Sequence, residues 1–367
     1  MDELSIQARI NEVTQVATSP EQLLTGVLHA LIALAELEVQ SKVGLFLVDT
    51  EQSKGSVSFE RSTLEGRKGL RLVTTIGPFS DEFLEREAWI PAGACLCGRA
   101  ALSGEVIISN NCFNDPRHEH QFEGMTAHGH YIIPLKSQGE VIGVIFLYTD
   151  PDPAWDERRV SLFETLGTQI GIALDRLWTM SELQTSQEQL YHLATHDSLT
   201  ELKNRRAILE SLTEERNRAQ RQGQSVGVIM VDIDKFKLIN DNNGHPVGDD
   251  VLLETSRRLT EAVRPYDTVG RLGGEEFLII LPSTDLAKAG IAAERVRALV
   301  AARPMSCRDG LNLPITISLG VTSTNQRTSE QLSDDLLVAE ADAALYRAKD
   351  SGRNCVQMAR IKGGGGK

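Results

Sequence analysis

The sequence predicts an α+β protein of two domains, each containing helices and a largely antiparallel sheet, joined by a helical linker. Its 367 residues are enough for two hydrophobic cores. Hydrophobic residues make up 41% and charged residues 24%, which is typical of a soluble globular protein. The order of helical and strand patterns changes after residue 197, which indicates a second domain from there on.

In the N-terminal part, apolar residues recur at helical spacing over residues 20–38 and predict a helix. The residues before it, 1–19, are expected to form a helical extension. The segments KVGLFLVDT and LRLVTTIG predict strands, and HYIIPLKSQGEVIGVIFLYT predicts a hairpin that turns at Ser-Gln-Gly. A long helix is expected from near Asp156 to beyond Asp175.

Residues 175–196 are expected to be a helical linker, because they lack glycine and proline and are rich in helix-forming residues. They carry an approximate apolar stripe with a polar middle, made of Leu177, Met180, Leu183, Leu190 and Leu193. Two interpretations stay open: a solvated connecting helix, or a short parallel coiled coil that joins two subunits.

The C-terminal part, residues 197–360, alternates helices with strands. The expected order is the helix DSLTELKNRRAILESLTEERNRAQ, the strand SVGVIMVDID, a helix from about Gly248 to Val263, the hairpin VGRLGGEEFLIILP, the helix LAKAGIAAERVRALVAA, the strand LPITISLGVTS, the helix LLVAEADAALYRAKDSG and the strand NCVQM. This order predicts an α+β sandwich of ferredoxin-like type. The final residues, 361–367, resemble a flexible tail.

Charge and composition exclude several classes of function. The net charge of −13 argues against general affinity for DNA or RNA. No apolar run approaches the roughly 18–20 residues of a membrane helix, and the N-terminus does not resemble a signal peptide. The five cysteines contain no Cys-x-x-Cys pair, so a disulfide framework is not expected. We therefore expect a cytoplasmic protein without a nucleic-acid or membrane partner.

Acidic residues stand at the ends of two predicted strands. Asp232 and Asp234 end one strand on the same side, and Glu275 begins another after the turn residues Gly273 and Gly274. Two such acids are also compatible with a solvated turn. If the two strands are neighbours, however, Asp232, Glu275 and the carbonyl of Ile233 can converge on one Mg²⁺ ion. A carboxylate-held metal on a ferredoxin-like palm indicates nucleotidyl transfer.

These motifs closely resemble the GGDEF family of diguanylate cyclases over residues 195–358. The resemblance is carried by DSLTELKNRR, DIDKFKLINDNNGHPVGDD, RLGGEEF, SLGVT and ALYRAKDSGRN, with Glu275 in the position of the aspartate in the family name. It implies that a homodimer condenses two GTP molecules into cyclic di-GMP and pyrophosphate with Mg²⁺ or Mn²⁺, the two catalytic domains facing each other.

The resemblance also implies roles for individual residues. It places the metal on Asp232, Ile233 and Glu275, of which Glu275 also assists deprotonation of the ribose 3′-hydroxyl, and guanine on Asn240 and Asp249. Phosphate contacts are implied for Lys237, Lys349, Arg353 and the backbone near Phe236. Lys349 and Arg353 are four residues apart, so we expect them on one face of the last helix.

Arg264 and Asp267 form an Arg-x-x-Asp segment before the glycines, in RPYD. At this spacing the resemblance implies an inhibitory site for the product. An arginine can bond both phosphate and guanine, and an aspartate can accept from guanine. An ordinary salt-bridged surface is the alternative.

Residues 20–174 resemble a GAF domain, which implies a PAS-like antiparallel sheet with helices and a sensory or dimerising role. One segment concentrates thiols and imidazoles that could bind a transition metal or sense redox state: Cys95, Cys97, Cys112, His118, His128 and His130. If Cys95 and Cys97 lie in a strand, they share one face. Buried thiols with polar loop histidines, or a pocket for a cyclic nucleotide or another small ligand, remain open as alternatives.

Together the patterns predict a GAF input domain that controls a diguanylate cyclase through the linker. Two other functions remain as alternatives. One is a catalytically silent module that binds GTP or cyclic di-GMP; the presence of the glycine-acid motif and both metal acids counts against it. The other is a different nucleotide cyclase on a related palm, against which Asn240 and Asp249 favour guanine.

Overall fold

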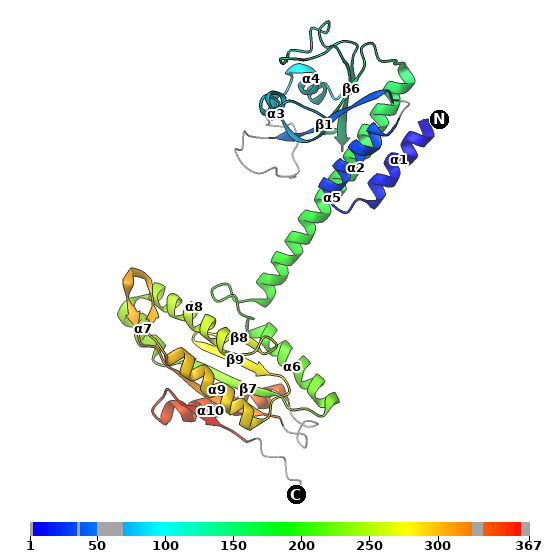
Figure 1. The fold of residues 1–367 in the computed structure, drawn as a ribbon. Helices are drawn as coiled ribbons and strands as arrows, with labels where there is room; N and C mark the ends of the chain where they lie inside the picture. Colours follow the sequence, from blue (N-terminus) through cyan, green and yellow to red (C-terminus); the bar gives the residue numbers. More distant parts are fainter. Residues whose placement is uncertain (1–2, 35–36, 50–68, 325–332, 361–367) are drawn as a thin grey trace. The chain divides into compact units, whose positions relative to one another are not determined.

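The computed structural model describes residues 3–34, 37–49, 69–324 and 333–360 (Figure 1). It divides into two compact units, with the division between Ser186 and Gln187. The predicted tail, residues 361–367, lies outside the described residues. Among the helices of the described residues, none combines the length and the apolar character needed to cross a bilayer.

The first unit is built around a six-stranded sheet in the order β3-β2-β1-β6-β5-β4, in which all neighbouring strands run antiparallel. Its strands are β1 (Val39–Asp49), β2 (Gly69–Ile76), β3 (Trp89–Pro91), β4 (Ile107–Ser109), β5 (Gly129–Ser137) and β6 (Glu140–Thr149). Its helices are α1 (Glu3–Val16), α2 (Pro20–Ile32), α3 (Asp81–Arg86), α4 (Cys95–Ser103) and α5 (Glu157–Thr195), the last of which continues into the second unit.

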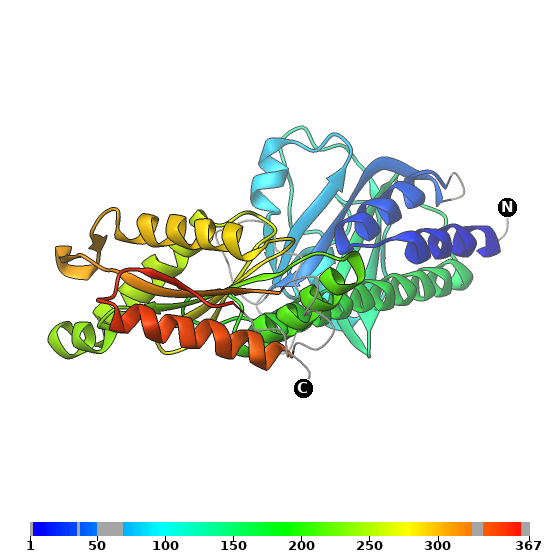
Figure 2. The same cartoon turned by 90° about the horizontal axis from the view of Figure 1, so that it is seen from below.

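Two hydrophobic cores lie on the two faces of this sheet. One core joins α1, α2 and the first half of α5 to the sheet, and the other lies under α3 and α4 (Figures 1 and 2). The close approach of α5 to β5 depends on Gly167 and Gly171. A Cβ atom at either glycine would lie 2.3 Å from a backbone oxygen of β5.

The second unit contains a five-stranded sheet in the order β13-β12-β7-β9-β8, antiparallel except for the β12–β13 pair. Its strands are β7 (Gly227–Ile233), β8 (Thr268–Gly273), β9 (Glu276–Leu281), β12 (Ile317–Ser323) and β13 (Val356–Met358), and a small separate sheet pairs β10 (Met305–Ser306) with β11 (Asn312–Leu313). Its helices are α6 (Arg205–Gln222), α7 (Phe236–Asn243), α8 (His245–Ala262), α9 (Leu286–Ala301) and α10 (Asp334–Asp350), with a short 3₁₀ turn, η2 (Arg308–Gly310).

The helices of the second unit cover both faces of its sheet. Alternate residues of β7 and β9 point into a core with α8 and α9 on one side and into a core with α6 and α10 on the other. Figure 2 shows α9 (yellow) and α10 (red) on opposite sides of the strands. The predicted α+β class and the hairpin of β8 and β9 are therefore confirmed.

Several predicted helix ends are wrong. The first long helix ends at Ile32 rather than residue 38. Residues 197–204 form a turn before α6, because the Asp197 carboxylate accepts hydrogen bonds from Thr200 instead of entering a helix. The segment before Gly248 contains α7, and α8 already begins at His245, where Pro246 fits the first turn of a helix.

The expected linker is part of the 39-residue helix α5. Leu177 does not belong to its exposed stripe, because that side chain is buried in the core of the first unit. Met180, Leu183, Leu190 and Leu193 are exposed along the rest of the helix. A solvated helix and a coiled coil with a second chain both agree with this exposure.

Candidate active site

The two strands that carry the predicted metal-binding acids are neighbours. Asp232 on β7 pairs in register with Glu276 on β9, and the Ile233 N–H donates to the Glu275 carbonyl over 3.3 Å. Because paired residues of an antiparallel sheet point to the same side, Asp232 and Glu276 share one face. The pairing of the two strands therefore brings Asp232, Glu275 and Glu276 to the same end of the β7–β9 pair.

The carboxylates at this end influence one another. Asp232 is buried, and its Oδ2 atom lies 2.7 Å from the Nζ atom of Lys349 on α10. Burial raises the pKa of Asp232, and the Lys349 ammonium opposes that shift. Burial and the nearby charge of Asp232 also raise the pKa of Glu275. A divalent cation would favour the charged form of both acids, and oxygen donors of this kind suit Mg²⁺ or Mn²⁺.

Asp234 does not act with Asp232 as an open pair. It follows the end of β7, and its carboxylate accepts hydrogen bonds from the Thr316 hydroxyl, the Ser318 hydroxyl and the Asn354 N–H at 2.6–3.0 Å. These bonds fix the backbone immediately before α7. Asp234 therefore has a structural role, although it lies near Asp232, whose pKa is raised by burial and further by the charge of Asp234.

The turn that precedes β9 requires glycine because of its backbone angles. Gly273 and Gly274 have φ values of +144° and +53°, and a Cβ atom at either would meet no neighbour. The Arg271 guanidinium donates to the Gly274 carbonyl at 2.7 and 3.1 Å and to the Asp197 carboxylate at 2.9 Å. Arg271 thus ties the turn that carries Glu275 to the segment before α6.

The N-terminus of α7 adjoins the end of β7. Lys235 precedes it with φ +59°, Phe236 is buried and Lys237 is exposed. The first N–H groups of a helix lack partners within the helix and can bind an anion. This geometry agrees with the phosphate contacts implied for Phe236 and Lys237.

Asn240 on α7 and Asp249 on α8 lie on two helices that pack together. The Oδ1 atom of Asn240 is buried and has no hydrogen-bond partner among the described residues. It occupies the space beside Gly248, where an added Cβ atom would approach it to 1.9 Å. Asp249 is exposed. An unpaired acceptor beside an exposed carboxylate is suited to a ligand that carries N–H groups.

The expectation that Lys349 and Arg353 share a helical face is wrong. Helix α10 ends at Asp350, and the chain turns at Gly352, which has φ +105°. Arg353 follows with φ +67°, and its N–H donates to the Ala348 carbonyl. Lys349 therefore lies on the helix beside Asp232, while Arg353 is an exposed residue of the following turn.

Arg264 and Asp267 do not form the surface salt bridge that was the alternative for this segment. The Asp267 carboxylate accepts the backbone N–H of Arg264 at 2.8 Å, and the Arg264 guanidinium donates to the Tyr266 hydroxyl at 2.9 Å. Both residues line a pocket with Lys288 and Arg295. Three basic side chains around one pocket are suited to an anionic ligand.

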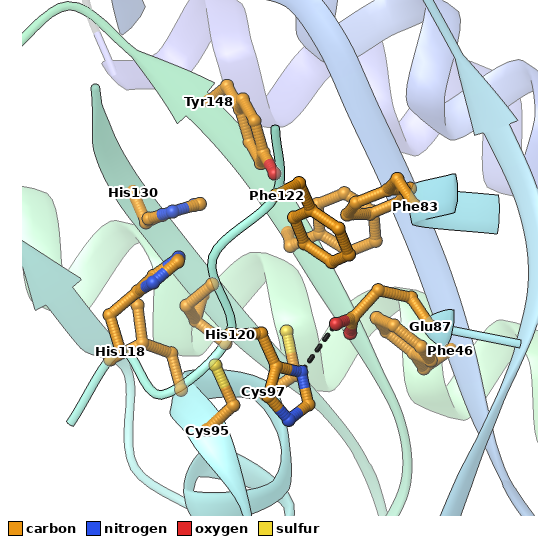
Figure 3. A pocket seen from close by; sticks show the side chains of 13 residues that line it. Phe46, Phe83, Glu87, Cys95, Cys97, His118, His120, Phe122, His130 and Tyr148 are labelled. Atoms are coloured by element: carbon orange, nitrogen blue, oxygen red, sulfur yellow. Dashed lines mark hydrogen bonds and ion pairs between the residues drawn. The ribbon is translucent and has the colours of Figure 1, made fainter. Parts of the chain in front are cut away.

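In the first unit the candidate cysteines and histidines only partly come together. Cys95, Cys97, His118 and His130 line one pocket, together with the rings of Phe46, Phe83, Phe122, Phe146 and Tyr148 (Figure 3). Cys95 and Cys97 belong to helix α4 rather than to a strand. His118, His128 and His130 lie close together, whereas the Cys112 thiol donates to the Thr126 carbonyl at 3.7 Å. The structure describes all five cysteines, and each is a free thiol.

Sequence reasoning missed several residues that shape these sites. Glu276 faces Asp232, Arg271 holds the glycine turn, and Glu87 pairs with His120 in the pocket of the first unit. The alternation of strand residues could have placed Glu276 beside Asp232, but no local pattern links Arg271 to Asp197 or Glu87 to His120.

Two family models match this chain. The model for the diguanylate cyclase GGDEF domain matches residues 194–355, and the model for the GAF domain matches residues 17–175.

Several curated proteins are similar to part of this chain. The response regulator PleD of Caulobacter vibrioides is 39% identical over 194 residues, which are 53% of this chain and 42% of PleD. Diguanylate cyclase A of Treponema denticola is 31% identical over 233 residues, which are 63% of this chain and 59% of that protein. The chain thus spans about half the length of these curated relatives. A crystal structure of the coiled coil and GGDEF domain of DgcB from Caulobacter crescentus, in complex with c-di-GMP, is 31% identical and covers 50% of this chain and 96% of that chain, with a TM-score of 0.47.

Proposed function

We propose, from the premise that this chain combines a GAF domain with a domain of the GGDEF family, that it is a diguanylate cyclase. It would condense two GTP molecules into cyclic di-GMP and release two pyrophosphates. The observation that supports this proposal most strongly is the meeting of Asp232, Glu275 and Glu276 at one end of two paired strands, beside Lys349.

In this proposal Asp232, Glu275 and the Ile233 carbonyl hold Mg²⁺ or Mn²⁺. The bound ion offsets the negative charge of the triphosphate. Glu275 accepts the proton of the ribose 3′-hydroxyl as that oxygen bonds to the α-phosphorus of the other GTP. The bond from the α-phosphorus to pyrophosphate breaks in the same step.

The base and the triphosphate are assigned to two different sets of residues. Asn240 and Asp249 bind the guanine edge, for which the unpaired Oδ1 atom of Asn240 provides an acceptor. Lys237, Lys349, Arg353 and the N–H groups near Phe236 contact the phosphates. Lys349 holds the buried Asp232 charge in the structure and is within reach of the same region. With nucleotide and metal bound, a phosphate would pair with Lys349 and the metal ion would pair with Asp232, so both charges would keep a partner of opposite sign.

The reaction needs two GTP molecules, and one catalytic domain supplies the residues that bind one of them. A homodimer in which two catalytic domains face each other provides the second half of the site. We assign the control of this encounter to the GAF domain, acting through helix α5. The Arg264 and Asp267 pocket is assigned to cyclic di-GMP as an inhibitory site, since its basic side chains suit the two phosphates.

The test is to incubate the purified chain with GTP and Mg²⁺ and to separate the products by chromatography. We expect cyclic di-GMP, its loss on removal of the metal with a chelator, and no corresponding product from ATP. Asp232→Asn and Glu275→Gln should each lower the rate at least about 100-fold, as loss of a group that stabilises the transition state does. Glu261→Gln, an exposed change on α8, is the control. Folded chain that binds GTP without turnover would overturn the enzymatic proposal.

Inhibition is tested in the same assay. Added cyclic di-GMP should slow the wild-type chain and should slow an Arg264→Ala variant much less. Equal inhibition of the two would remove this pocket as the inhibitory site.

A further inference from the structure

Three imidazoles gather on one side of the sheet in the first unit. His128 and His130 flank Gly129 at the start of β5, and His118 comes from the segment between β4 and β5. The rings of His118 and His130 are stacked with centroids 5.0 Å apart, and those of His128 and His130 lie 4.6 Å apart. The loop before β5 and the start of that strand thus bring the same chemical group to one place.

The nitrogen atoms of this cluster are buried and lack partners. His128 and His130 are only 2% and 4% exposed. The Nδ1 atom of His118, the Nε2 atom of His128 and both ring nitrogens of His130 have no hydrogen-bond partner among the described residues. A buried polar atom without a partner is costly, so an arrangement with four of them calls for an explanation.

The orientation of His128 is fixed by a hydrogen bond. Its Nδ1 atom lies 2.7 Å from the Thr126 carbonyl, which can only accept, so Nδ1 carries the proton. The Nε2 atom is then the one with a free lone pair. A backbone carbonyl that orients one nitrogen in this way is typical of histidines that bind a metal through the other nitrogen.

One potential ligand atom from each of the three histidines lies within 4.8 Å of the other two. Burial lowers the pKa of all three side chains, and the neighbouring imidazoles lower those of His118 and His130 further. They are therefore neutral near pH 7, the state in which imidazole binds metals.

We propose that His118, His128 and His130 together bind one divalent transition-metal ion, of which Zn²⁺ and Fe²⁺ are the foremost candidates. Imidazole ligands favour such ions over Mg²⁺ or Ca²⁺. The ion would satisfy one buried nitrogen of each ring. The proposal is independent of the cyclase reaction, because all three ligands belong to the first unit.

Three protein ligands leave at least one coordination position for a further group. His118 and His130 also line the pocket of Figure 3, whose walls include the rings of Phe46, Phe83 and Phe146. In Figure 3 these two imidazoles lie on one side of the pocket, across from Phe46 and Phe83. A water molecule or a small ligand that enters the pocket would complete the coordination of the metal ion. By exchanging water for such a ligand, the metal ion would allow the GAF domain to sense that ligand.

The cysteines are not part of this ligand set. Among the described residues, no cysteine sulfur groups with the three imidazole ligand atoms, and the Cys112 thiol donates to the Thr126 carbonyl. His120 is not part of this set either, because the ligand atoms that lie within 4.8 Å of one another belong to His118, His128 and His130. The structure thus reduces the mixed set of thiols and imidazoles expected from the sequence to three histidines.

The experiment uses the full chain, freed of metal with a chelator and titrated with Co²⁺ in excess Mg²⁺. The Mg²⁺ occupies oxygen-ligand sites, so Co²⁺ reports on imidazole. We expect one Co²⁺ per chain, strong ligand-field absorption in the visible range, and an increase in the thermal unfolding temperature.

Removing one histidine should weaken Co²⁺ binding by more than the roughly 10–100-fold that loss of a ligand's hydrogen-bond partner costs. His118→Ala is the first variant, since this side chain is only partly buried and lies outside the sheet; His128→Gln is the second. His29→Gln on helix α2 is the control and should bind as the wild type does. Folded wild-type chain that shows no saturable absorption, or equal binding by His118→Ala, would overturn the proposal.

Discussion

The position of the Asn240 side chain depends on the absence of a Cβ atom at Gly248. Its carbonyl oxygen occupies space that exists only because residue 248 is glycine, and it has no partner among the described residues. A polar atom that is held in place and left unpaired is prepared to bind a ligand. Under the proposed function that ligand is guanine.

We predict that Gly248→Ala weakens GTP binding through Asn240. The new methyl group would displace the Asn240 amide, which is the end of a flexible side chain, so the domain should still fold. The Michaelis constant for GTP should rise about 10-fold, in proportion to a lost hydrogen bond of about 1.4 kcal/mol.

A double-mutant cycle provides the control for this prediction. In an Asn240→Ala background the change at residue 248 should have little further effect on the Michaelis constant, because the group that it displaces is gone. Additive effects of the two changes would contradict the explanation.

At the scale of elements, the hairpin of β8 and β9 depends on a contact outside itself. Arg271 bonds the carbonyl at its turn and the Asp197 carboxylate, and its N–H donates to the Lys203 carbonyl. Asn204 in the same segment caps α6 and donates to the Ala194 carbonyl of α5. The turn that carries Glu275 is therefore connected by hydrogen bonds to the end of helix α5.

We predict that Arg271→Met lowers cyclase activity even under conditions in which the variant stays folded. Loss of these hydrogen bonds should reduce the free energy of unfolding by about 1–3 kcal/mol, measured with denaturant, while the loosened turn no longer holds Glu275 in place. The maximal rate should fall at temperatures where the variant remains folded.

Arg206→Met is the matched control, because the Arg206–Glu210 ion pair is exposed and such pairs contribute little. A variant at Arg271 with reduced stability and an unchanged rate would show that the turn is positioned by other contacts.

The elements show why some of the site could be predicted from the sequence. The two strand patterns predict that β7 and β9 are neighbours, and this pairing brings Asp232 to the glycine turn that carries Glu275. Ser351 and Gly352 signal the end of α10, so the four-residue spacing of Lys349 and Arg353 does not predict a shared helical face.

The histidine cluster could be predicted only in part. The alternation of His128 and His130 is a local signal, so their shared side follows from it. The position of His118 depends on the path of a loop, which no periodic pattern specifies. Closeness in sequence groups the cysteines with the histidines, yet α4 places Cys95 and Cys97 on a separate element.

At the scale of the whole molecule, the proposed reaction requires two chains. Helix α5 leaves Met180, Leu183, Leu190 and Leu193 exposed beyond the core of the first unit. Leu183 and Leu190 are seven residues apart, the spacing of a coiled-coil seam. A second α5 helix would cover these side chains.

We therefore predict that changing both Leu183 and Leu190 to glutamate weakens dimerisation. Charges in an apolar seam repel each other and lose hydration, so the mass measured by light scattering should shift towards the monomer, and cyclase activity should fall with it. A Ser181→Glu, Thr185→Glu variant adds the same charge on the opposite side of the helix and should remain dimeric. An unchanged mass and rate in the leucine variant would exclude a coiled coil of α5 as the dimer contact.

The most direct test of the central claim is a crystal structure of the chain with Mn²⁺ and 3′-deoxy-GTP, which lacks the attacking hydroxyl. Anomalous scattering locates the metal independently of the nucleotide. We expect the Mn²⁺ peak at bonding distance from the carboxylates of Asp232 and Glu275, with the triphosphate on the same ion and the guanine edge at Asn240 and Asp249. A metal ion elsewhere in the second unit, or a nucleotide bound away from these two acids, would contradict the account.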